Sequence, residues 1–164
     1  MKKIGLLSDT HGWWDEKYAT HFEPCDEIWH AGDIGSVRVA ERLNAIKPLR
    51  AVYGNTDGYE LRLMFSRVYQ FTIENVKVML THIGGYPGRY DSSIHTELHA
   101  AKPNLFISGH SHILKVMYDK NLNCLHINPG AAGHSGIHRV RTLIRFVIDK
   151  DDIKDLEIIE LGKR

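Results

Sequence analysis

The sequence has few cysteines and no long hydrophobic run. Cys25 and Cys124 are the only cysteines in 164 residues. They are too few for a disulfide framework, so we expect a reducing compartment. Uninterrupted apolar runs reach about five residues, far short of the roughly 20 that a membrane-spanning helix needs. The first residues, Met1 to Ile4, lead directly into a strand-like run without the apolar region of a signal peptide. We therefore expect a cytoplasmic protein with no membrane partner.

The sequence also lacks an excess of charge of one sign. Lysine and arginine number 21 and aspartate and glutamate 20, for a net charge of +1. This balance gives no strong sign of nucleic-acid binding. No linker, repeat or low-complexity stretch divides the chain, and its length suits one domain. We expect residues 1–164 to form a single domain. The sequence leaves open whether this domain forms a homo-oligomer.

Short apolar runs are present instead, and they predict strands that are buried on both faces. They span residues 4–7, 27–29, 49–53, 76–80 and 105–107. Ser36 is a candidate N-cap for an amphipathic helix over residues 37–46. A second helix is expected to begin after Ser92 or Ser93 and to run through Ala101.

The remaining apolar segments predict antiparallel hairpins with polar turns. The expected pairs are 69–73 with 76–80, 115–120 with 125–128, and 142–149 with 156–161. Parallel strands joined by helices, together with hairpins, favour a layered α/β domain. We expect two packed mixed β-sheets flanked by helices on their outer faces.

Each of the five buried runs ends in a cluster of potential metal ligands. In chain order these ligands are Asp9, His11, Asp33, Asn55, His82, His110 and His112. Carboxyl ends of strands meet at one edge of an open α/β sheet, so these side chains should converge. Nitrogen and oxygen donors without a thiolate suit Mn²⁺, Fe²⁺, Zn²⁺ or Ni²⁺. Seven side chains exceed the needs of one ion, which favours a two-metal site with one bridging carboxylate.

Single clusters are weak signals, because Gly-Asp and Gly-Asn-x-Asp are also common turns. The joint occurrence of all five, each at a strand end, favours the metal site. Ligating histidines also need hydrogen-bond partners, and His30 and Asp57 are candidates for that supporting role. His30 fits a buried structural histidine equally well. No function is expected for the remaining histidines His21, His95, His99 and His126.

The motif order D-x-H, G-D, G-N-x-D, H and G-H-x-H resembles the calcineurin-like metallophosphoesterase superfamily, in particular its small stand-alone prokaryotic phosphodiesterases. Asn128-Pro129-Gly130 also resembles a segment of that family. The resemblance implies an αββα sandwich. It implies one metal ion held by Asp9, His11, Asp33 and His112. It implies a second ion held by Asp33, Asn55, His82 and His110. A hydroxide between the ions would then attack phosphorus in line with the leaving oxygen.

The chain departs from the family pattern at three positions. Thr56 stands where many relatives have the histidine thought to protonate the leaving group, so esters with good leaving groups should be favoured. Ile83 follows the histidine of the fourth motif, where the family has glycine. Ala131 follows the Asn-Pro-Gly segment, where serine is usual. His134 and His138 could compensate, although solvated loop positions are the simpler interpretation.

The function expected from these features is hydrolysis of a small phosphodiester with two divalent ions, Mn²⁺ being the first candidate. A phosphomonoesterase with the same site is one alternative. Another is a non-catalytic protein-binding scaffold, since the fold also resembles the retromer scaffold subunit. The seven filled ligand positions disfavour the scaffold. An H-x-H amidohydrolase is disfavoured because that pair would belong on the first strand.

Overall fold

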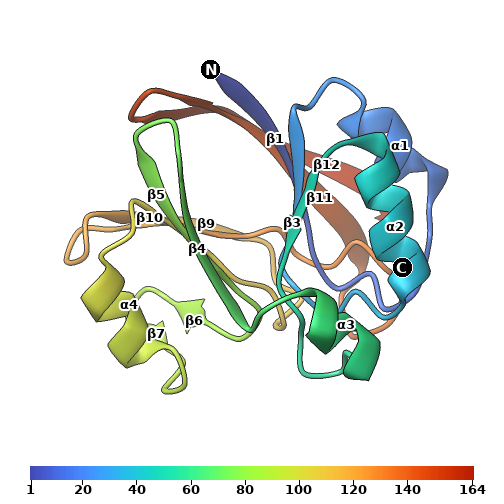
Figure 1. The fold of residues 1–164 in the computed structure, drawn as a ribbon, viewed down its shortest axis with the longest axis horizontal. Coiled ribbons are helices and arrows are strands. Elements are labelled where there is room, and N and C mark those ends of the chain that lie inside the picture. The colour runs from blue at the N-terminus through green and yellow to red at the C-terminus, as the bar shows by residue number, and fades with distance from the viewer.

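The computed structural model describes residues 1–164 and contains two five-stranded mixed sheets (Figure 1). The first sheet has the order β12-β11-β1-β2-β3. Its strands are β1 (Lys2–Leu7), β2 (Glu27–His30), β3 (Leu49–Ala51), β11 (Val140–Asp149) and β12 (Asp152–Lys163). β1, β2 and β3 are parallel, whereas β11 and β12 form an antiparallel hairpin that pairs with the other side of β1.

The second sheet has a parallel centre and an antiparallel strand at each edge. Its order is β4-β5-β8-β10-β9. The strands are β4 (Val68–Ile73), β5 (Val76–Thr81), β8 (Leu105–Ile107), β9 (Lys115–Asp119) and β10 (Cys124–Asn128). A separate ribbon consists of β6 (Gly85–Tyr86) and β7 (Arg89–Tyr90). The parallel strands thus reach one edge of the first sheet and occupy the middle of the second.

The hydrophobic core lies between the two sheets. Fifteen buried residues from both sheets form one contiguous cluster. Trp29 is a fully buried member of this cluster, with its ring edge-on to Phe71 at 5.0 Å and to Phe146 at 5.7 Å between ring centroids. Edge-to-face contacts of this kind add to the hydrophobic stabilisation of the buried rings. The core thus holds the two sheets face to face and fixes the positions of their strand ends.

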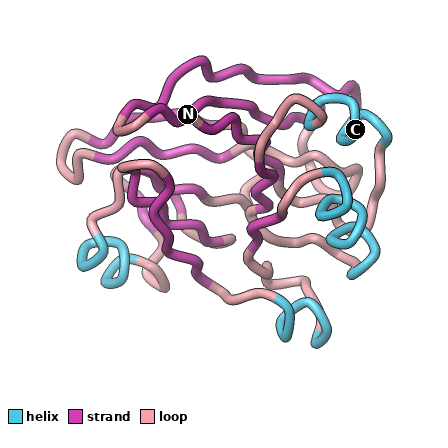
Figure 2. Tube along the Cα trace, turned by 45° about the horizontal axis from the view of Figure 1, so that its top comes forward, coloured by secondary structure: helices cyan, strands magenta, loops and turns pink.

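Helices cover the outer faces of the sandwich (Figure 2). α1 (Glu16–Phe22) and α2 (Val37–Ile46) pack on the first sheet through a second buried cluster, to which Tyr18 and Leu43 belong. α4 (His95–Ala101) packs on the second sheet through Leu98. The two-sheet sandwich with outer helices confirms the predicted fold class. No helix is long and apolar enough to cross a membrane.

The predicted hairpins and the helix over residues 37–46 are confirmed, with Ser36 accepting a hydrogen bond from the Val39 amide at 3.3 Å. The predicted start of α4 is wrong. The Asp91 carboxylate accepts hydrogen bonds from both the amide and the hydroxyl of Ser93, so the chain makes a polar turn before the helix starts at His95. The third predicted strand ends at Ala51 rather than at residue 53.

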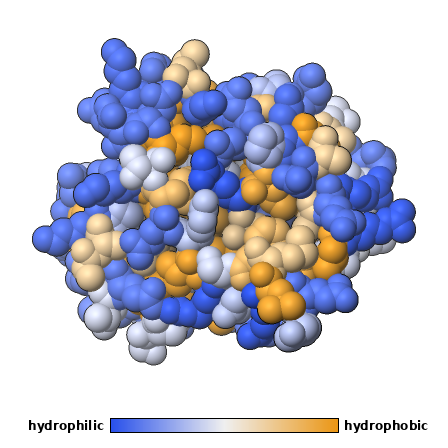
Figure 3. Space-filling model, in the orientation of Figure 1, coloured by the Kyte–Doolittle hydropathy of each residue, from blue (hydrophilic) through white to orange (hydrophobic).

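Three elements were not predicted: α1, α3 (Tyr59–Met64) and the β6–β7 ribbon. α1 and α3 have 7 and 6 residues, and two helical turns are too short for a clear 3.6-residue period. α3 leaves Tyr59, Leu63 and Met64 exposed. Figure 3, in the orientation of Figure 1, shows hydrophobic residues on the surface in the region of α3.

Candidate metal centre

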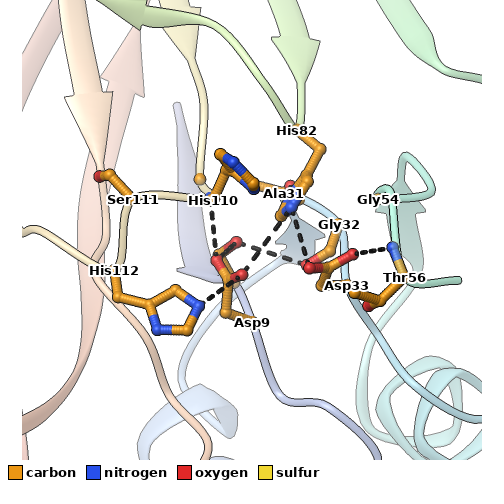
Figure 4. Close-up of polar contacts among 12 residues, drawn as sticks. Asp9, Ala31, Gly32, Asp33, Gly54, Thr56, His82, His110, Ser111 and His112 are labelled. Atoms are coloured by element: carbon orange, nitrogen blue, oxygen red, sulfur yellow. Dashed lines mark hydrogen bonds and ion pairs between the residues drawn. The ribbon is translucent and has the colours of Figure 1, made fainter. Parts of the chain in front are cut away.

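Four strand ends, two from each sheet, bring six of the seven predicted ligands together. Figure 4 shows five of them: Asp9, Asp33, His82, His110 and His112. The loops after β1 and β2 belong to the first sheet, and those after β5 and β8 belong to the second. The ligand atoms form two groups, each within 4.8 Å: Asp9, His11 and His112 in one group, and Asp33, His82 and His110 in the other. The convergence predicted from the strand-end pattern is therefore observed for these six residues.

Asp9 is fully buried at the centre of the first group. Its Oδ1 atom lies 3.1 Å from Nε2 of His112 and 3.6 Å from Nε2 of His11. Its Oδ2 atom accepts hydrogen bonds from the Ser8 hydroxyl at 2.6 Å and from the His110 amide at 3.1 Å. Burial opposes the charged form, but the facing rings of His11 and His112 hold the pKa of Asp9 well below its usual range. Asp9 is thus a carboxylate whose second oxygen is fixed by the protein.

Asp33 lies between the two groups. Its Oδ2 atom is 3.1 Å from Nε2 of His82 and 3.7 Å from Nε2 of His11, so it faces a histidine of each group. Its Oδ1 atom accepts a hydrogen bond from the Thr56 amide at 2.9 Å. Burial raises the pKa of Asp33, but the His82 ring that faces it and the hydrogen bond from the Thr56 amide lower it to about 2. Asp9 also faces both groups, because its Oδ1 atom lies 3.8 Å from Nε2 of His82. Both carboxylates therefore lie between the two histidine groups.

Two of the histidine nitrogens that face these carboxylates have no hydrogen-bond partner. Nδ1 of His82 donates to the carbonyl oxygen of Ala31 at 2.7 Å, which leaves the lone pair of the neutral ring on Nε2. Nε2 of His82 and Nε2 of His11 are buried without a hydrogen-bond partner. Burial of an unsatisfied polar atom is costly, and a cation between these nitrogens and the carboxylates would satisfy both. The residues therefore fit a divalent metal site.

The backbone of the ligand loops is left-handed where the side chains must converge. The φ angles are +57° at Asp9, +45° at His11, +54° at Asp33, +70° at His110 and +61° at His112. Non-glycine residues rarely adopt this conformation, and they concentrate at functional sites. Glycine allows the close approach of neighbouring loops. A Cβ on Gly54 would lie 2.0 Å from Oδ1 of Asp33, and one on Gly109 would lie 2.2 Å from the Ser8 hydroxyl.

Asn55, the seventh predicted ligand, is exposed at the edge of the cluster. It lines a pocket together with His82, which belongs to the second group. Its side chain makes no hydrogen bond to the other six residues, and its backbone carbonyl accepts a hydrogen bond from Arg62 at 3.2 Å. The structure places Asn55 beside the second group without bringing it into contact.

Asp57 supports the site through the backbone rather than through Asn55 or a histidine. The buried carboxylate accepts hydrogen bonds from the amides of Ile34 at 3.1 Å, Gly35 at 2.8 Å and Gly54 at 2.9 Å. These amides follow Asp33 and precede Asn55. The expected hydrogen bond from Asp57 to a ligand side chain is therefore not formed. Asp57 instead joins the loop after β2 to the loop after β3.

His30 is buried and contacts no ligand side chain. Its Nδ1 atom accepts from the Gly32 amide at 3.0 Å, so Nε2 carries the proton and donates to the Thr10 hydroxyl at 3.0 Å. Burial lowers the pKa of His30 to about 4, so the ring is neutral at pH 7. Of the two interpretations left open by the sequence, the structure favours a satisfied buried histidine that holds the loops after β1 and β2.

The end of β10 and the segment that follows it carry residues that support the ligand loops. Nδ2 of Asn128 donates to the carbonyl of Gly109 at 3.0 Å and to the Ser111 hydroxyl at 3.1 Å, which fixes the loop between His110 and His112. The ring of His138 lies edge-on to His112, with centroids 5.1 Å apart. The Asn-Pro-Gly motif was the one available signal for this support. His138 was a possible compensating residue in the sequence, with a solvated loop position as the simpler interpretation, and its ring instead contacts His112.

His134 lies elsewhere, edge-on to Trp13 with ring centroids 4.2 Å apart. This exposed residue makes no contact with the ligand set, in agreement with the loop interpretation. Of the two loop histidines, only His138 reaches a predicted ligand.

Comparisons with known proteins agree with this geometry. Residues 1–151 match the calcineurin-like phosphoesterase superfamily domain. A protein of Methanothermobacter thermautotrophicus named "Probable metallophosphoesterase" is 32% identical over 140 residues, which cover 78% of this chain and 76% of the relative.

Solved structures show the same fold. Vps29 from Entamoeba histolytica, in a complex with zinc, has a TM-score of 0.74 at 15% identity over 96% of this chain and 98% of its own. Yfce, a phosphoesterase from E. coli, has a TM-score of 0.60 at 19% identity over 94% of this chain and 98% of its own.

Proposed function

The chain belongs to the calcineurin-like phosphoesterase superfamily, and on that premise we propose that it is a divalent-metal-dependent phosphodiesterase with a dinuclear site. The observation that carries the proposal is the position of Asp33, whose Oδ2 atom faces His82 at 3.1 Å and His11 at 3.7 Å. One carboxylate oxygen between two histidine groups suits two ions that share a ligand.

The proposed ligands divide around Asp33. Asp9, His11, Asp33 and His112 would hold one ion, and Asp33, Asn55, His82 and His110 would hold the other. When bound, two such ions acidify the attacking water and neutralise charge on the phosphoryl oxygens. Donors are nitrogen and oxygen only, which suits Mn²⁺ and equally Zn²⁺, Fe²⁺ or Ni²⁺. The zinc complex of the structurally similar Vps29 supports including Zn²⁺ in the test.

The protein itself orients the ligands. The Ser8 hydroxyl and the His110 amide hold one oxygen of Asp9, and the Thr56 amide holds one oxygen of Asp33. In each carboxylate the other oxygen faces the histidines. These contacts fix the charged ligands before a substrate arrives, so little reorganisation is needed during the reaction.

No side-chain acid stands at position 56 to protonate the leaving group. Thr56 contacts Asp33 through its backbone amide, and a hydroxyl does not supply protons near neutral pH as an imidazolium does. We therefore propose that esters with acidic leaving-group alcohols are the preferred substrates.

Hydrolysis of bis(4-nitrophenyl) phosphate and of 4-nitrophenyl phosphate tests the function. The metal-free protein is assayed with Mn²⁺, Zn²⁺, Fe²⁺ or Ni²⁺, and again with a chelator. We expect diester turnover that requires metal and is abolished by the chelator. Faster turnover of the monoester would favour a phosphomonoesterase.

A non-catalytic protein-binding scaffold is the second candidate. Ile113 and the β9 residues Val116, Met117 and Tyr118 expose apolar side chains, which favours a partner surface. Absence of turnover with all four metals, in a protein whose circular dichroism spectrum shows that it is folded, would support the scaffold and contradict the proposed enzyme.

A further inference from the structure

A pocket of about 270 Å³ opens beside the second ligand group. Asn55 and His82 form part of its wall, and Tyr53, Arg62, Arg67 and Ser93 are among the other residues that line it. It therefore begins at the proposed metal centre and extends away from it toward α3 and the start of α4. A molecule bound at the metal centre would have its neighbouring group in this pocket.

Arg62 on α3 is held in a fixed orientation in this wall. Its Nε atom donates to the carbonyl of Asp57 at 2.7 Å, and Nη2 donates to the carbonyl of Asn55 at 3.2 Å. The guanidinium stacks over the ring of Tyr53 at 4.7 Å from the centroid. These three contacts leave Nη1 without a protein partner, so the group is oriented but retains unused donors.

The charge of Arg62 is not neutralised by the protein. No carboxylate lies within 4.0 Å of its guanidinium, and the nearby carboxylate of Asp57 already accepts three backbone amides. Arg67, the other arginine in the wall, differs because it forms an ion pair with Glu97 of α4. Arg62 is thus the unpaired cation of this pocket.

We propose that the pocket is a subsite for a second anionic group of the substrate, bound by Arg62. The inference rests on the proposed function, because it places the reacting phosphoester at the centre formed by His82 and its neighbours. The substrate class is a phosphodiester whose non-leaving alcohol carries a carboxylate or a phosphate on a short spacer. A guanidinium binds either anion through parallel N–H donors, and its fixed orientation lowers the entropic cost of doing so.

Three esters with the same 4-nitrophenyl leaving group test the subsite. They are the ethyl, 2-carboxyethyl and 2-phosphonoethyl 4-nitrophenyl phosphates, assayed with Mn²⁺. We expect KM at least about tenfold lower for an anionic ester than for the ethyl ester, because a charge-assisted hydrogen bond is gained. The two anionic esters distinguish a carboxylate from a phosphate.

Four variants assign that preference to Arg62. Arg62→Gln should reduce the KM preference to less than about threefold, and Arg62→Lys should retain part of it, because the charge stays but the planar fork is lost. Arg67→Gln should keep most of the preference, since its charge is already paired with Glu97. Arg38→Gln removes the same charge from an exposed site on α2 and should leave all three KM values unchanged.

The outcomes separate the subsite from the proposed function. Metal-dependent turnover with equal KM for the three esters would overturn the subsite and leave the phosphodiesterase standing. Without any turnover, calorimetry of the Mn²⁺-loaded protein with phosphonoacetate and with methylphosphonate decides the question. Tighter binding of phosphonoacetate that Arg62→Gln abolishes would support the subsite alone, and equal binding of the two compounds would overturn it.

Discussion

Two regions of the molecule use the same unusual backbone conformation for different purposes. Ten non-glycine residues have positive φ angles, and five of them are among the seven proposed ligands at the strand ends. The other five lie in turns, at a helix end and at an irregularity in β12: Glu74, Lys102, Asn123, Lys150 and Asp155. In the second set, the conformation serves only to reverse or bend the chain.

The two sets of positive-φ residues differ in whether the side chain is needed. In the turns, a glycine would meet the backbone requirement at lower conformational cost. At the strand ends, a glycine would relieve the same cost but remove a carboxylate or an imidazole from the cluster. Retention of strained residues there is understandable when those side chains bind an ion whose contacts outweigh the strain.

Alanine at Asp33 and at Asp155 is the sharpest test of this comparison, because both aspartates have φ near +50°. Asp33→Ala removes the carboxylate between the two groups. We expect it to lose bound metal and to lower diester turnover by about 10³-fold or more, on the scale of losing a major electrostatic stabiliser. Asp155→Ala changes an exposed residue of β12 and should leave both quantities unchanged.

Bound Mn²⁺ is measured by mass spectrometry after gel filtration, and turnover is measured with excess Mn²⁺. Asp33→Asn keeps the shape of the side chain and tolerates the left-handed backbone, so it controls for a local collapse. Full activity of Asp33→Ala in a preparation free of wild-type enzyme would show that the carboxylate is not a shared ligand.

Most of the ligand set could be predicted from the sequence because the signal is local. Asp9, Asp33 and His82 each follow a short apolar run, and the rule that carboxyl strand ends converge needs no knowledge of sheet order. The contacts of Asp57 could not be predicted, since they join the loop after β2 to the loop after β3. The same holds for His138, which reaches His112 across 26 residues of chain.

The fold shows the same division between local and distant information. Hairpins were predictable because their two strands and turn are adjacent in sequence. The pairing of β1 with β11 depends on residues more than 130 positions apart, such as Ile4 with Phe146, and no local pattern encodes it. α1 and α3 are stabilised by burial of Tyr18, Phe22 and Leu61 in the second core cluster rather than by strong amphipathic periodicity.

The close approach of Gly54 to the ligand Asp33 gives a second test. Gly54→Ala would place a methyl group 2.0 Å from Oδ1 of Asp33 and 2.4 Å from its amide nitrogen. We expect a loss of about 1–3 kcal/mol in the free energy of unfolding from overpacking, together with weaker metal binding. Gly58→Ala, four residues later, meets no atom within 4 Å and is the matched control.

Urea unfolding of the two metal-free variants measures the stability difference, and titration with Mn²⁺ measures the effect on the site. Equal stability and equal metal affinity for the two would contradict the idea that loop contacts at Gly54 position Asp33.

The effect of acid pH on stability provides a third test. It concerns two buried histidines, His30 at the end of β2 and His126 within β10. Burial lowers the pKa of both His30 and His126 to about 4 from the ordinary 6.5. Between pH 6.5 and 4 the unfolded chain binds these protons and the folded chain does not. Stability should therefore fall as the pH falls, by about 1.4 kcal/mol per pH unit for each histidine.

Neither ring nitrogen of His126 has a hydrogen-bond partner, so His126→Leu should fold and should remove one of these two contributions. Denaturant unfolding at pH 7, 6 and 5 gives the slope for the metal-free protein and for the variant. An unchanged slope would mean that His126 becomes protonated in the folded state with its ordinary pKa.

The smallest effect is expected from Lys150→Gly in the turn between β11 and β12. Lys150 is exposed and has φ +57°, and the turn contact it provides, from the Asn75 amide to its carbonyl, uses backbone alone. Relief of the left-handed conformation is worth about 1–2 kcal/mol, and the greater freedom of glycine in the unfolded chain offsets about 0.4–1 kcal/mol of it. We expect a net gain of about 0.5 kcal/mol in the free energy of unfolding, measured by urea denaturation, with metal affinity and turnover unchanged. A loss of stability would show that the left-handed backbone at Lys150 is not strained. The turns and the ligand loops would then differ only in whether their side chains can bind a metal ion.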